Sequence, residues 1–272
     1  MASTKMRLGV AGASGRMGRM LVREIAATEG AVLAAATEAP NNPAIGKDVG
    51  ELAGVARAGV AIGADPAAMF AACDAVLDFT APAITVQHAA LAAQSRVIHV
   101  IGTTGIDAEQ AAAIHRAAKH TPIVWGDNMG VGINLLSAVV EHVARTLGID
   151  WDIEVVEMHH KHKVDAPSGT ALKLGRAAAK GRGVDLDKVS ARGRDGHTGA
   201  RKAGDIGFAS LRGGDVVGDH TVIFAGAAER IELTHRATGR EIYARGAVRA
   251  ALWAKGRPAG LYGMDDVLGL KS

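Results

Sequence analysis

The sequence predicts an α/β protein with two domains, a doubly wound parallel sheet and an α+β domain with a mixed sheet. Short apolar runs alternate with helix-like segments over about the first 130 residues, and a glycine-rich turn follows the first run. After about Gly130 the rhythm changes, because strand-like runs follow one another closely with glycine breaks between them. The first pattern is typical of parallel strands and the second of antiparallel or mixed pairing.

The chain begins with a predicted strand, turn and helix, over residues 7–11, 12–18 and 19–28. In a dinucleotide-binding interpretation, the turn glycines have three separate roles. They make the tight turn, let the backbone approach a pyrophosphate and bring the helix against the strand, in the order Gly12, Gly15 and Gly18.

A second apolar run, residues 31–37, supports this interpretation. It ends at Glu38, which lies 20 residues beyond Gly18. A Rossmann-type fold places the acid that holds the adenosine ribose at about this spacing. The alternative is an α/β domain whose glycines only make turns.

Three further strands and two helices complete the predicted parallel sheet. The strands are residues 75–80, 96–101 and 122–125, and the helices are residues 84–94 and a segment that Asp107 and Gln110 cap and that runs to about His120. Ligands of such sheets bind outside the carboxyl ends of the strands. Residues 102–104 and 126–129 lie at two of these ends, so we expect them to meet a ribose or nicotinamide. Ordinary turn chemistry is the alternative.

The second domain is predicted from helices at 132–147 and 168–180 and from strands at 152–157, 206–211, 215–217, 221–224 and 230–235. Residues 181–201, rich in glycine and charge, are predicted to form an exposed loop. A last helix, residues 244–254, is expected to return to the first domain.

Three histidines and two lysines crowd into residues 159–163, just before a predicted helix start at Ser168. Histidine, with an unperturbed pKa of about 6.5, both gives and takes protons near neutral pH, and lysine supplies a fixed positive charge. Ser168 as N-cap, followed by the N–H groups of Gly169 and Thr170, makes an anion site at a helix N-terminus. The stretch therefore indicates acid–base chemistry on a substrate that carries carboxylates.

Geometry requires a bend in this stretch. In a continuous strand His159 and Lys163 would lie about 13 Å apart, too far to act on one small ring. Two alternatives stay open at this point: a solvated basic strand end, and a zinc site on His159, His160 and His162, whose spacing matches no usual zinc pattern.

Composition indicates an ordinary enzyme. The net charge of +3 and an aromatic content of 3% give little support for a nucleic-acid surface. No apolar run reaches the roughly 18 residues of a membrane span, and no secretory signal is visible at the start. The lone Cys73 fits a reducing compartment. We therefore expect a cytoplasmic protein with neither a nucleic-acid nor a membrane partner.

Residues 157–170, from Glu157 to Thr170, closely resemble the signature of the 4-hydroxy-tetrahydrodipicolinate (dihydrodipicolinate) reductases of the diaminopimelate route to lysine. Other blocks that resemble this family follow in family order over essentially the whole chain. They are residues 12–18, 78–80, 100–105, 196–199 with 206–208, and 246–249 through 266–268.

The resemblance implies that a reduced nicotinamide, NADH or NADPH, delivers hydride to a cyclic imine dicarboxylate while the 4-hydroxyl leaves as water. His159 would be the general acid/base, and Lys163 the proton donor or carboxylate anchor. The residues implied to hold the substrate are His160, Lys163, Ser168, Gly169 and Thr170. Those implied to bind the cofactor are Gly12, Ala13, Ser14, Gly15, Arg16, Met17, Glu38, Gly102, Thr103, Thr104, Gly126, Asp127, Asn128 and Met129. No metal is implied.

The resemblance also implies an organisation. Residues 1–130 with 241–272 would bind the dinucleotide, and residues 131–240 would bind substrate and join four chains in a homotetramer. The two domains of such enzymes close on each other.

Two departures from the family pattern stand out. Many relatives carry arginine where this chain has Ala39, which removes a partner for the 2′-phosphate of NADPH. Glu38 followed by Ala39 therefore predicts a preference for NADH, although Arg16 remains as a possible phosphate contact. The second departure is the sequence of residues 126–130, where Asp127 either points outward or alters loop closure.

A different nicotinamide oxidoreductase and a dinucleotide sensor without catalysis are the competing function classes.

Overall fold

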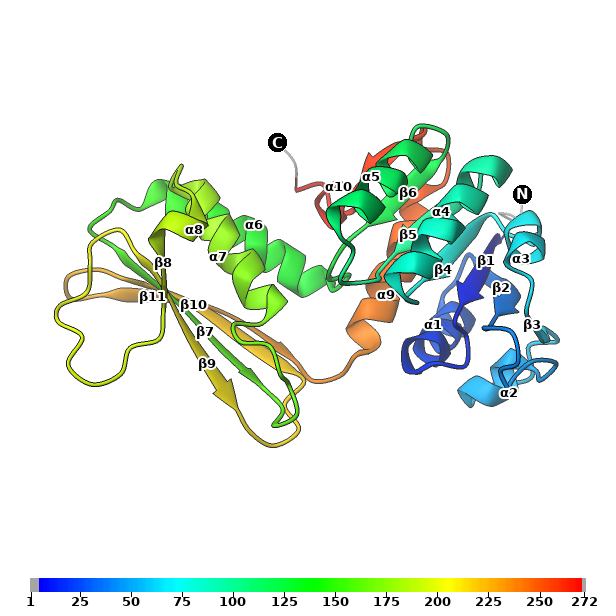
Figure 1. Cartoon of the computed structure of the whole chain (residues 1–272), viewed down its shortest axis with the longest axis horizontal. Coiled ribbons are helices and arrows are strands. Elements are labelled where there is room, and N and C mark those ends of the chain that lie inside the picture. Colours follow the sequence, from blue (N-terminus) through cyan, green and yellow to red (C-terminus); the bar gives the residue numbers. More distant parts are fainter. Residues whose placement is uncertain (1–4, 271–272) are drawn as a thin grey trace. The chain divides into compact units, whose positions relative to one another are not determined.

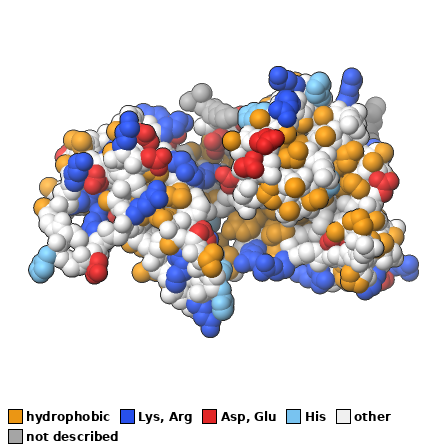
Figure 2. Space-filling view, in the orientation of Figure 1, with side chains coloured by type: hydrophobic (Ala, Val, Ile, Leu, Met, Phe, Trp, Pro, Cys, Tyr) orange, Lys and Arg blue, Asp and Glu red, His pale blue; other side chains and the backbone are white. Residues whose placement is uncertain are grey.

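The computed structural model describes residues 5–270, which divide into two compact units. The first unit comprises residues 5–131 with 240–270, and the second comprises residues 132–239 (Figure 1). No helix within residues 5–270 has the length and apolar character needed to cross a bilayer. Lys and Arg side chains lie on both units with Asp and Glu among them (Figure 2), which agrees with the small net charge.

The first unit is built on a seven-stranded sheet in which every pairing is parallel. Its strand order is β12-β6-β5-β4-β1-β2-β3, so the chain moves outward from β1 in both directions, as in a Rossmann-type sheet. The strands are β1 (Met6–Ala11), β2 (Ala31–Thr37), β3 (Ile62–Gly63), β4 (Ala75–Asp78), β5 (Ile98–Ile101), β6 (Pro122–Trp125) and β12 (Gly260–Tyr262). The predicted doubly wound parallel sheet is confirmed.

Helices cover both faces of this sheet, which explains why its strands are almost continuously apolar. One face packs against α1 (Arg16–Ala27) and α9 (Glu241–Ala254), with α2 (Val49–Ala53) and α10 (Met264–Val267) beside them. The other face packs against α3 (Pro66–Ala72), α4 (Pro82–Ser95) and α5 (Ala108–Ala117). Helix α9 belongs to this core although it follows the second unit in the chain, as expected for the last predicted helix.

Several boundaries in the first unit differ from the prediction. Helix α1 begins at Arg16, three residues before the predicted start. Strand β4 ends at Asp78, because its carboxylate accepts hydrogen bonds from Thr80 and turns the chain. Strand β5 begins only at Ile98, since Arg96 has a φ of +55° at the end of α4. The short elements α2, α3, β3, β12 and α10 were not predicted.

The second unit has a mixed sheet of five strands in the order β11-β10-β7-β9-β8. Strand β9 pairs in parallel with β7 and β8, whereas β10 is antiparallel to β7 and β11, so the predicted mixed pairing is confirmed. Helices α6 (Val131–Thr146), α7 (Gly169–Gly181) and α8 (Leu186–Val189) pack on one face of this sheet (Figure 1). The strands are β7 (Asp152–His159), β8 (Ser190–Arg192), β9 (Ile206–Arg212), β10 (Gly218–Ala225) and β11 (Arg230–Ala237).

Two predictions for this unit were wrong. Residues 181–201 do not form one exposed loop, because α8 and β8 lie within them and Leu186 is buried in the core. Residues 215–217 are not a strand but part of a turn, whose Val216 carbonyl accepts the backbone N–H of His160 at 2.8 Å.

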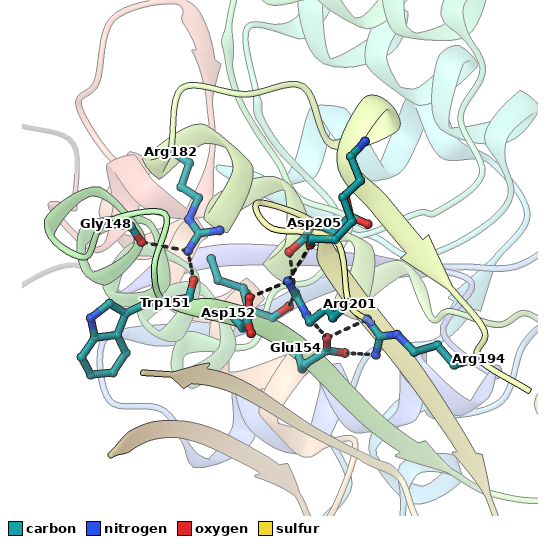
Figure 3. Close-up of polar contacts among 10 residues, drawn as sticks. Gly148, Trp151, Asp152, Glu154, Arg182, Arg194, Arg201 and Asp205 are labelled. Carbon is teal, nitrogen blue, oxygen red and sulfur yellow. Dashed lines mark hydrogen bonds and ion pairs between the residues drawn. The ribbon is translucent and has the colours of Figure 1, made fainter. Parts of the chain in front are cut away.

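An arginine cluster joins the segment after β8 to β7 (Figure 3). Arg194 donates to both carboxylate oxygens of Glu154, at 3.0 and 2.8 Å. Arg201 donates to Glu154 at 2.9 Å and to Asp152 at 2.7 Å. Glu154 alternates along β7 with buried Ile153 and Val155, so this cluster lies away from the helix-covered face.

Candidate active site

The turn after β1 presents backbone groups at the start of a twelve-residue helix. Gly12 has a φ of +66°, a left-handed conformation that favours glycine, and Gly15 is the N-cap of α1. Among the described residues no side chain caps α1, so its first N–H groups remain available to an anion. Gly18 lets the helix lie against the turn, because a β-carbon there would overlap the Gly12 carbonyl oxygen. This arrangement fits a pyrophosphate.

Glu38, just after β2, is tied to the same turn. Its Oε1 accepts hydrogen bonds from the backbone N–H of Ser14 at 2.9 Å and from the Ser14 hydroxyl at 2.6 Å. Its Oε2 accepts from the Asn42 amide at 3.2 Å and from the backbone N–H of Ala39 at 3.1 Å. The carboxylate therefore lies beside the turn, which is where a Rossmann-type fold has the acid that accepts ribose hydroxyls. Ala39 and Arg16 are both exposed.

Asp78, at the end of β4, is a buried carboxylate to which the sequence assigned no role. Its Oδ2 lies 2.8 Å from His88 Nδ1 and 3.1 Å from His99 Nε2, while its Oδ1 accepts from the backbone and hydroxyl of Thr80. Burial by itself would raise the pKa of Asp78, but the hydrogen bonds from the two histidines outweigh it and hold that pKa well below its usual range.

This cluster has the residue types of a metal site, and within residues 5–270 it is the group with that spacing. Both histidines, however, reach the same carboxylate oxygen at hydrogen-bond distance, so we interpret the cluster as a hydrogen-bond network. The network extends to the loop after β5 through the Thr85 hydroxyl, which donates to the Thr103 hydroxyl at 2.8 Å. The hydrogen bonds around Asp78 thereby connect the loops that follow β4 and β5.

The predicted cofactor residues lie at the carboxyl edge of the parallel sheet. Thr103 and Met129 are buried, whereas Thr104 and Asp127 are exposed. Asn128 Oδ1 accepts the backbone N–H of Gly130 at 2.9 Å and shapes the loop after β6. Strands β1, β2, β5 and β6 are parallel, so their carboxyl ends lie at one edge of the sheet. The predicted cofactor residues that follow these ends are Gly12, Ala13, Ser14, Gly15, Arg16, Met17, Glu38, Gly102, Thr103, Thr104, Gly126, Asp127, Asn128 and Met129.

In the second unit, a buried glutamate–histidine pair occupies the end of β7. Glu157 and His159 are two positions apart, so their side chains share the helix-covered face of the sheet. His159 Nδ1 lies 2.6 Å from Glu157 Oε2. Arg212 of β9 donates to both oxygens of Glu157, at 2.8 and 2.9 Å. The backbone N–H of Ser168 also donates to Glu157, at 3.2 Å, which links His159 to the start of α7.

Burial and charge set the protonation of this cluster. Burial lowers the pKa of His159 below its usual value, and the hydrogen bond to Glu157 opposes that effect. Burial by itself would raise the pKa of Glu157, but the bonds from Arg212 and His159 hold it at about 2. His220, whose ring centre lies 5.0 Å from that of His159, has its pKa lowered to about 4 by burial and by the neighbouring imidazole.

The start of α7 has the features of an anion site. Ser168 is its N-cap, with its Oγ accepting the Ala171 N–H at 3.1 Å and lying 3.0 Å from His220 Nε2. Gly169 is exposed and open space surrounds it. Lys163 lies in the preceding loop with its Nζ 2.8 Å from Asp165. A positive helix end and a nearby ammonium group together suit a carboxylate.

The chain bends directly after His159, as the spacing required. The His160 carbonyl accepts the backbone N–H of Lys163 at 3.1 Å, which closes a turn. The zinc interpretation gains no support, because His159 Nδ1 is bonded to Glu157 and His162 is exposed.

Three residues of this cluster had no role in the sequence-based prediction. The sequence could have indicated Glu157, since this residue stands two positions before His159 on a predicted strand and so shares its face. The sequence could not have indicated Arg212 and His220, because only the pairing of β9 and β10 with β7 brings them beside His159.

The two units correspond to two parts of one known family. Residues 6–129 match the family model described as dihydrodipicolinate reductase, N-terminus, and residues 132–268 match dihydrodipicolinate reductase, C-terminus. The chain belongs to the dihydrodipicolinate reductase family. This family consists of pyridine-nucleotide-dependent reductases with a Rossmann-type domain.

Curated relatives of this family align with the chain over essentially its whole length. The 4-hydroxy-tetrahydrodipicolinate reductase of Methylocella silvestris is 61% identical over 97% of each chain, and that of Rhizobium rhizogenes is 58% identical over 100% of each. A solved structure described as dipicolinate-bound dihydrodipicolinate reductase from Paenisporosarcina sp. TG-14 has a TM-score of 0.78 at 23% identity. It covers 97% of this chain and 100% of its own, and it supports the fold.

Proposed function

We propose that this chain catalyses the reduction of 4-hydroxy-tetrahydrodipicolinate to tetrahydrodipicolinate, with NADH or NADPH as reductant, in lysine biosynthesis. Overall, the reaction consumes one hydride from the reduced nicotinamide and one proton, and it releases the 4-hydroxyl as water. The observation that carries the proposal is the joint placement of His159 and the α7 N-terminus, both hydrogen-bonded to Glu157. A proton donor beside an anion site is what a cyclic imine dicarboxylate requires.

The second unit binds the substrate. Backbone N–H groups of Gly169 and Thr170 at the start of α7 receive one carboxylate, and the open space around Gly169 admits it closely. Lys163 exchanges its contact with Asp165 for the same carboxylate or supplies a proton. The half-buried His160 and the N-cap Ser168 complete the substrate contacts.

His159 handles the proton. Its Nδ1 is engaged by Glu157, so Nε2 is the nitrogen that remains for transfer to or from the substrate. Burial keeps its pKa below the usual histidine value, which allows the ring to give up a proton readily near neutral pH.

The first unit binds the dinucleotide and orients its nicotinamide, which supplies the hydride when bound. The turn at Gly12 and Gly15 receives the pyrophosphate, and Glu38 accepts the ribose hydroxyls. A 2′-phosphate would bring negative charge beside the Glu38 carboxylate, and Ala39 offers no cation to offset it. This arrangement favours NADH over NADPH, and the exposed Arg16 is the remaining cation near the turn.

Homotetramer formation through the second unit is part of the proposal. The sheet face away from the helices carries Val156, Met158 and Ile223, with Leu211 beside Met158 at 52% exposure. Light scattering should give four times the chain mass of 27.9 kDa, and Leu211→Glu should lower it. A monomer in the unchanged chain contradicts this part.

Cys73, buried and free, suits the reducing cytoplasm in which we place the enzyme.

A coupled assay tests the proposed reaction. The unstable substrate is generated in place from pyruvate and aspartate semialdehyde by the upstream synthase, and oxidation of NADH and NADPH is followed by absorbance. Oxidation that depends on the synthase supports the proposal. Activity on another oxo acid alone would favour a different oxidoreductase, and binding of cofactor without any turnover would favour a sensor.

A further inference from the structure

The end of β7 changes from hydrophobic core to a charged cluster along one face of the sheet. Val155 is buried against Phe208 and Val222 of the neighbouring strands. Two residues further on, Glu157 lies in register with His220. A carboxylate with 1% side-chain exposure in this position must have strong partners or it would be neutral.

We infer that Glu157 is a positioning residue for His159, fixing Nδ1 as its hydrogen-bonded nitrogen and leaving Nε2 to exchange the proton of the reaction. The inference rests on the proposed function for the identity of that reaction. Its physical basis is independent of the substrate, because it concerns the tautomer and orientation of one imidazole.

The first step of the argument is the direction of the hydrogen bond. Glu157 is ionised, so it only accepts, and the 2.6 Å contact therefore requires a proton on His159 Nδ1. In the neutral ring, Nε2 then carries a lone pair, and in the cation it carries the transferable proton. Among residues 5–270 no hydrogen bond occupies Nε2.

The second step is space for the ring. Gly218 of β10 lies against the free side of the imidazole, and a β-carbon there would come within 3.0 Å of Nε2. A larger residue at this position would crowd the nitrogen that must remain accessible. The ring is thus fixed through Nδ1 and left open at Nε2.

The third step is how Glu157 itself is held. Arg212 donates to both carboxylate oxygens of Glu157 in a bidentate pair, and it also donates to the Asp165 carbonyl at 2.6 Å. The Ser168 N–H occupies the same carboxylate. One carboxylate therefore sets the distance between the acid/base nitrogen and the helix start that receives the substrate carboxylate.

Four charged or titratable groups face His159: Glu157 on its own strand, Arg212 on β9, His220 on β10 and Lys163 in the following loop. Of these, Glu157 alone favours the protonated ring, since the other three disfavour it or are neutral. Replacing Glu157 by glutamine should therefore lower the pKa of His159. It should also allow the amide to donate to Nδ1, which would select the wrong tautomer.

The test compares Glu157→Gln with Glu154→Gln. Glu154 lies on the same strand and is paired with Arg194 and Arg201 (Figure 3). It is three positions from Glu157 and so lies on the opposite face of the sheet, and its loss should leave catalysis unchanged. For Glu157→Gln we expect kcat to fall about 10²-fold, and the alkaline limb of the kcat profile to move about one unit lower in pH. Arg212→Lys, which keeps the charge without the bidentate geometry, should change both in the same direction by less.

Nitrogen NMR of the histidine-labelled full chain provides a readout that needs no turnover. The His159 signal is assigned by its loss in His159→Asn. In the unchanged chain, neutral His159 should carry its proton on Nδ1, and in Glu157→Gln a population with the proton on Nε2 should appear. If the unchanged chain has no activity, the proposed function fails while this measurement still decides the role of Glu157.

Two results would overturn the inference. One is a proton on Nε2 of neutral His159 in the unchanged chain. The other is a Glu157→Gln variant that folds, as judged by thermal unfolding, and keeps the pH profile and kcat of Glu154→Gln. Should Glu157→Gln fail to fold, the tautomer in the unchanged chain decides, with Nδ1–H supporting the inference.

Discussion

The ring of Phe79 lies against the Cα of Gly102, in the space that a β-carbon at position 102 would occupy. Phe79 follows β4 and Gly102 follows β5, so this contact joins two neighbouring loops at the carboxyl edge of the parallel sheet. We expect Gly102→Ala to displace the ring, lower the free energy of unfolding by about 1–3 kcal/mol and raise the KM for NADH. Thermal unfolding and steady-state kinetics measure the two effects.

Gly63→Ala is the matched control. It also lies at a strand end of the same sheet, but the nearest atom to a β-carbon there is the Ala36 carbonyl oxygen at 3.9 Å. This variant should keep the stability and the KM of the unchanged chain. Equal KM values for NADH in the two variants would show that the Phe79 contact does not shape the cofactor site.

Cofactor preference should depend on position 39. The unchanged chain is expected to have a lower KM for NADH than for NADPH, because Glu38 disfavours a 2′-phosphate and Ala39 contributes no cation. Ala39→Arg should lower the KM for NADPH about tenfold through a charge-assisted contact, with little change for NADH. Ala39→Gln is the uncharged control. A clear NADPH preference in the unchanged chain contradicts the prediction.

Lys163 and Lys161 offer a matched pair for the substrate site. Lys163 has 21% side-chain exposure and pairs with Asp165, whereas Lys161 is exposed two residues earlier in the same loop. Lys163→Gln should lower kcat/KM for the substrate about 10²-fold, through loss of the carboxylate contact or the proton. Lys161→Gln should change it less than twofold. Similar losses in the two variants would indicate only a general electrostatic effect.

Stability should fall in mild acid because of His220. Its pKa is lowered to about 4 in the folded chain, so between pH 6.5 and 4 the unfolded state binds more protons. The free energy of unfolding should therefore decrease as pH falls through this window, by about 1 kcal/mol per pH unit for each extra proton bound. Urea unfolding at several pH values measures the slope.

His220→Gln should make that slope shallower. His162→Gln, at an exposed position, should leave it as it is in the unchanged chain. If the His220 variant keeps the full slope, the pH dependence arises from other groups.

Local sequence patterns predicted most of the fold. The apolar run at residues 31–37 coincides with β2, and the capping box of Asp107 and Gln110 is present in the structure. These features depend on neighbours a few residues away, which the sequence displays directly. Residues 181–201 were misjudged for the opposite reason. Leu186 becomes buried only because α7 and the sheet lie over it, and composition alone does not show that.

The same distinction applies to the active site. The sequence places His159, Ser168 and Gly169 in one short run. The chain turns after His159, and both His159 and the Ser168 N–H are bonded to Glu157. Arg212 lies 55 residues from Glu157 in the chain, and its contact depends on the register of β9 against β7. Asp78 lay within the strand predicted over residues 75–80 and had no role in the prediction, because its partners come from α4 and β5. Partners from distant strands require the tertiary structure.

Transfer of deuterium into the product from NADH deuterated at both C4 positions tests the central claim most directly. With substrate generated by the upstream synthase, mass spectrometry should find one deuterium in tetrahydrodipicolinate for each NADH oxidised, and His159→Asn should slow this transfer about 10²-fold or more. Oxidation of NADH without deuterium in that product, or equal rates in the unchanged chain and His159→Asn, would contradict the account.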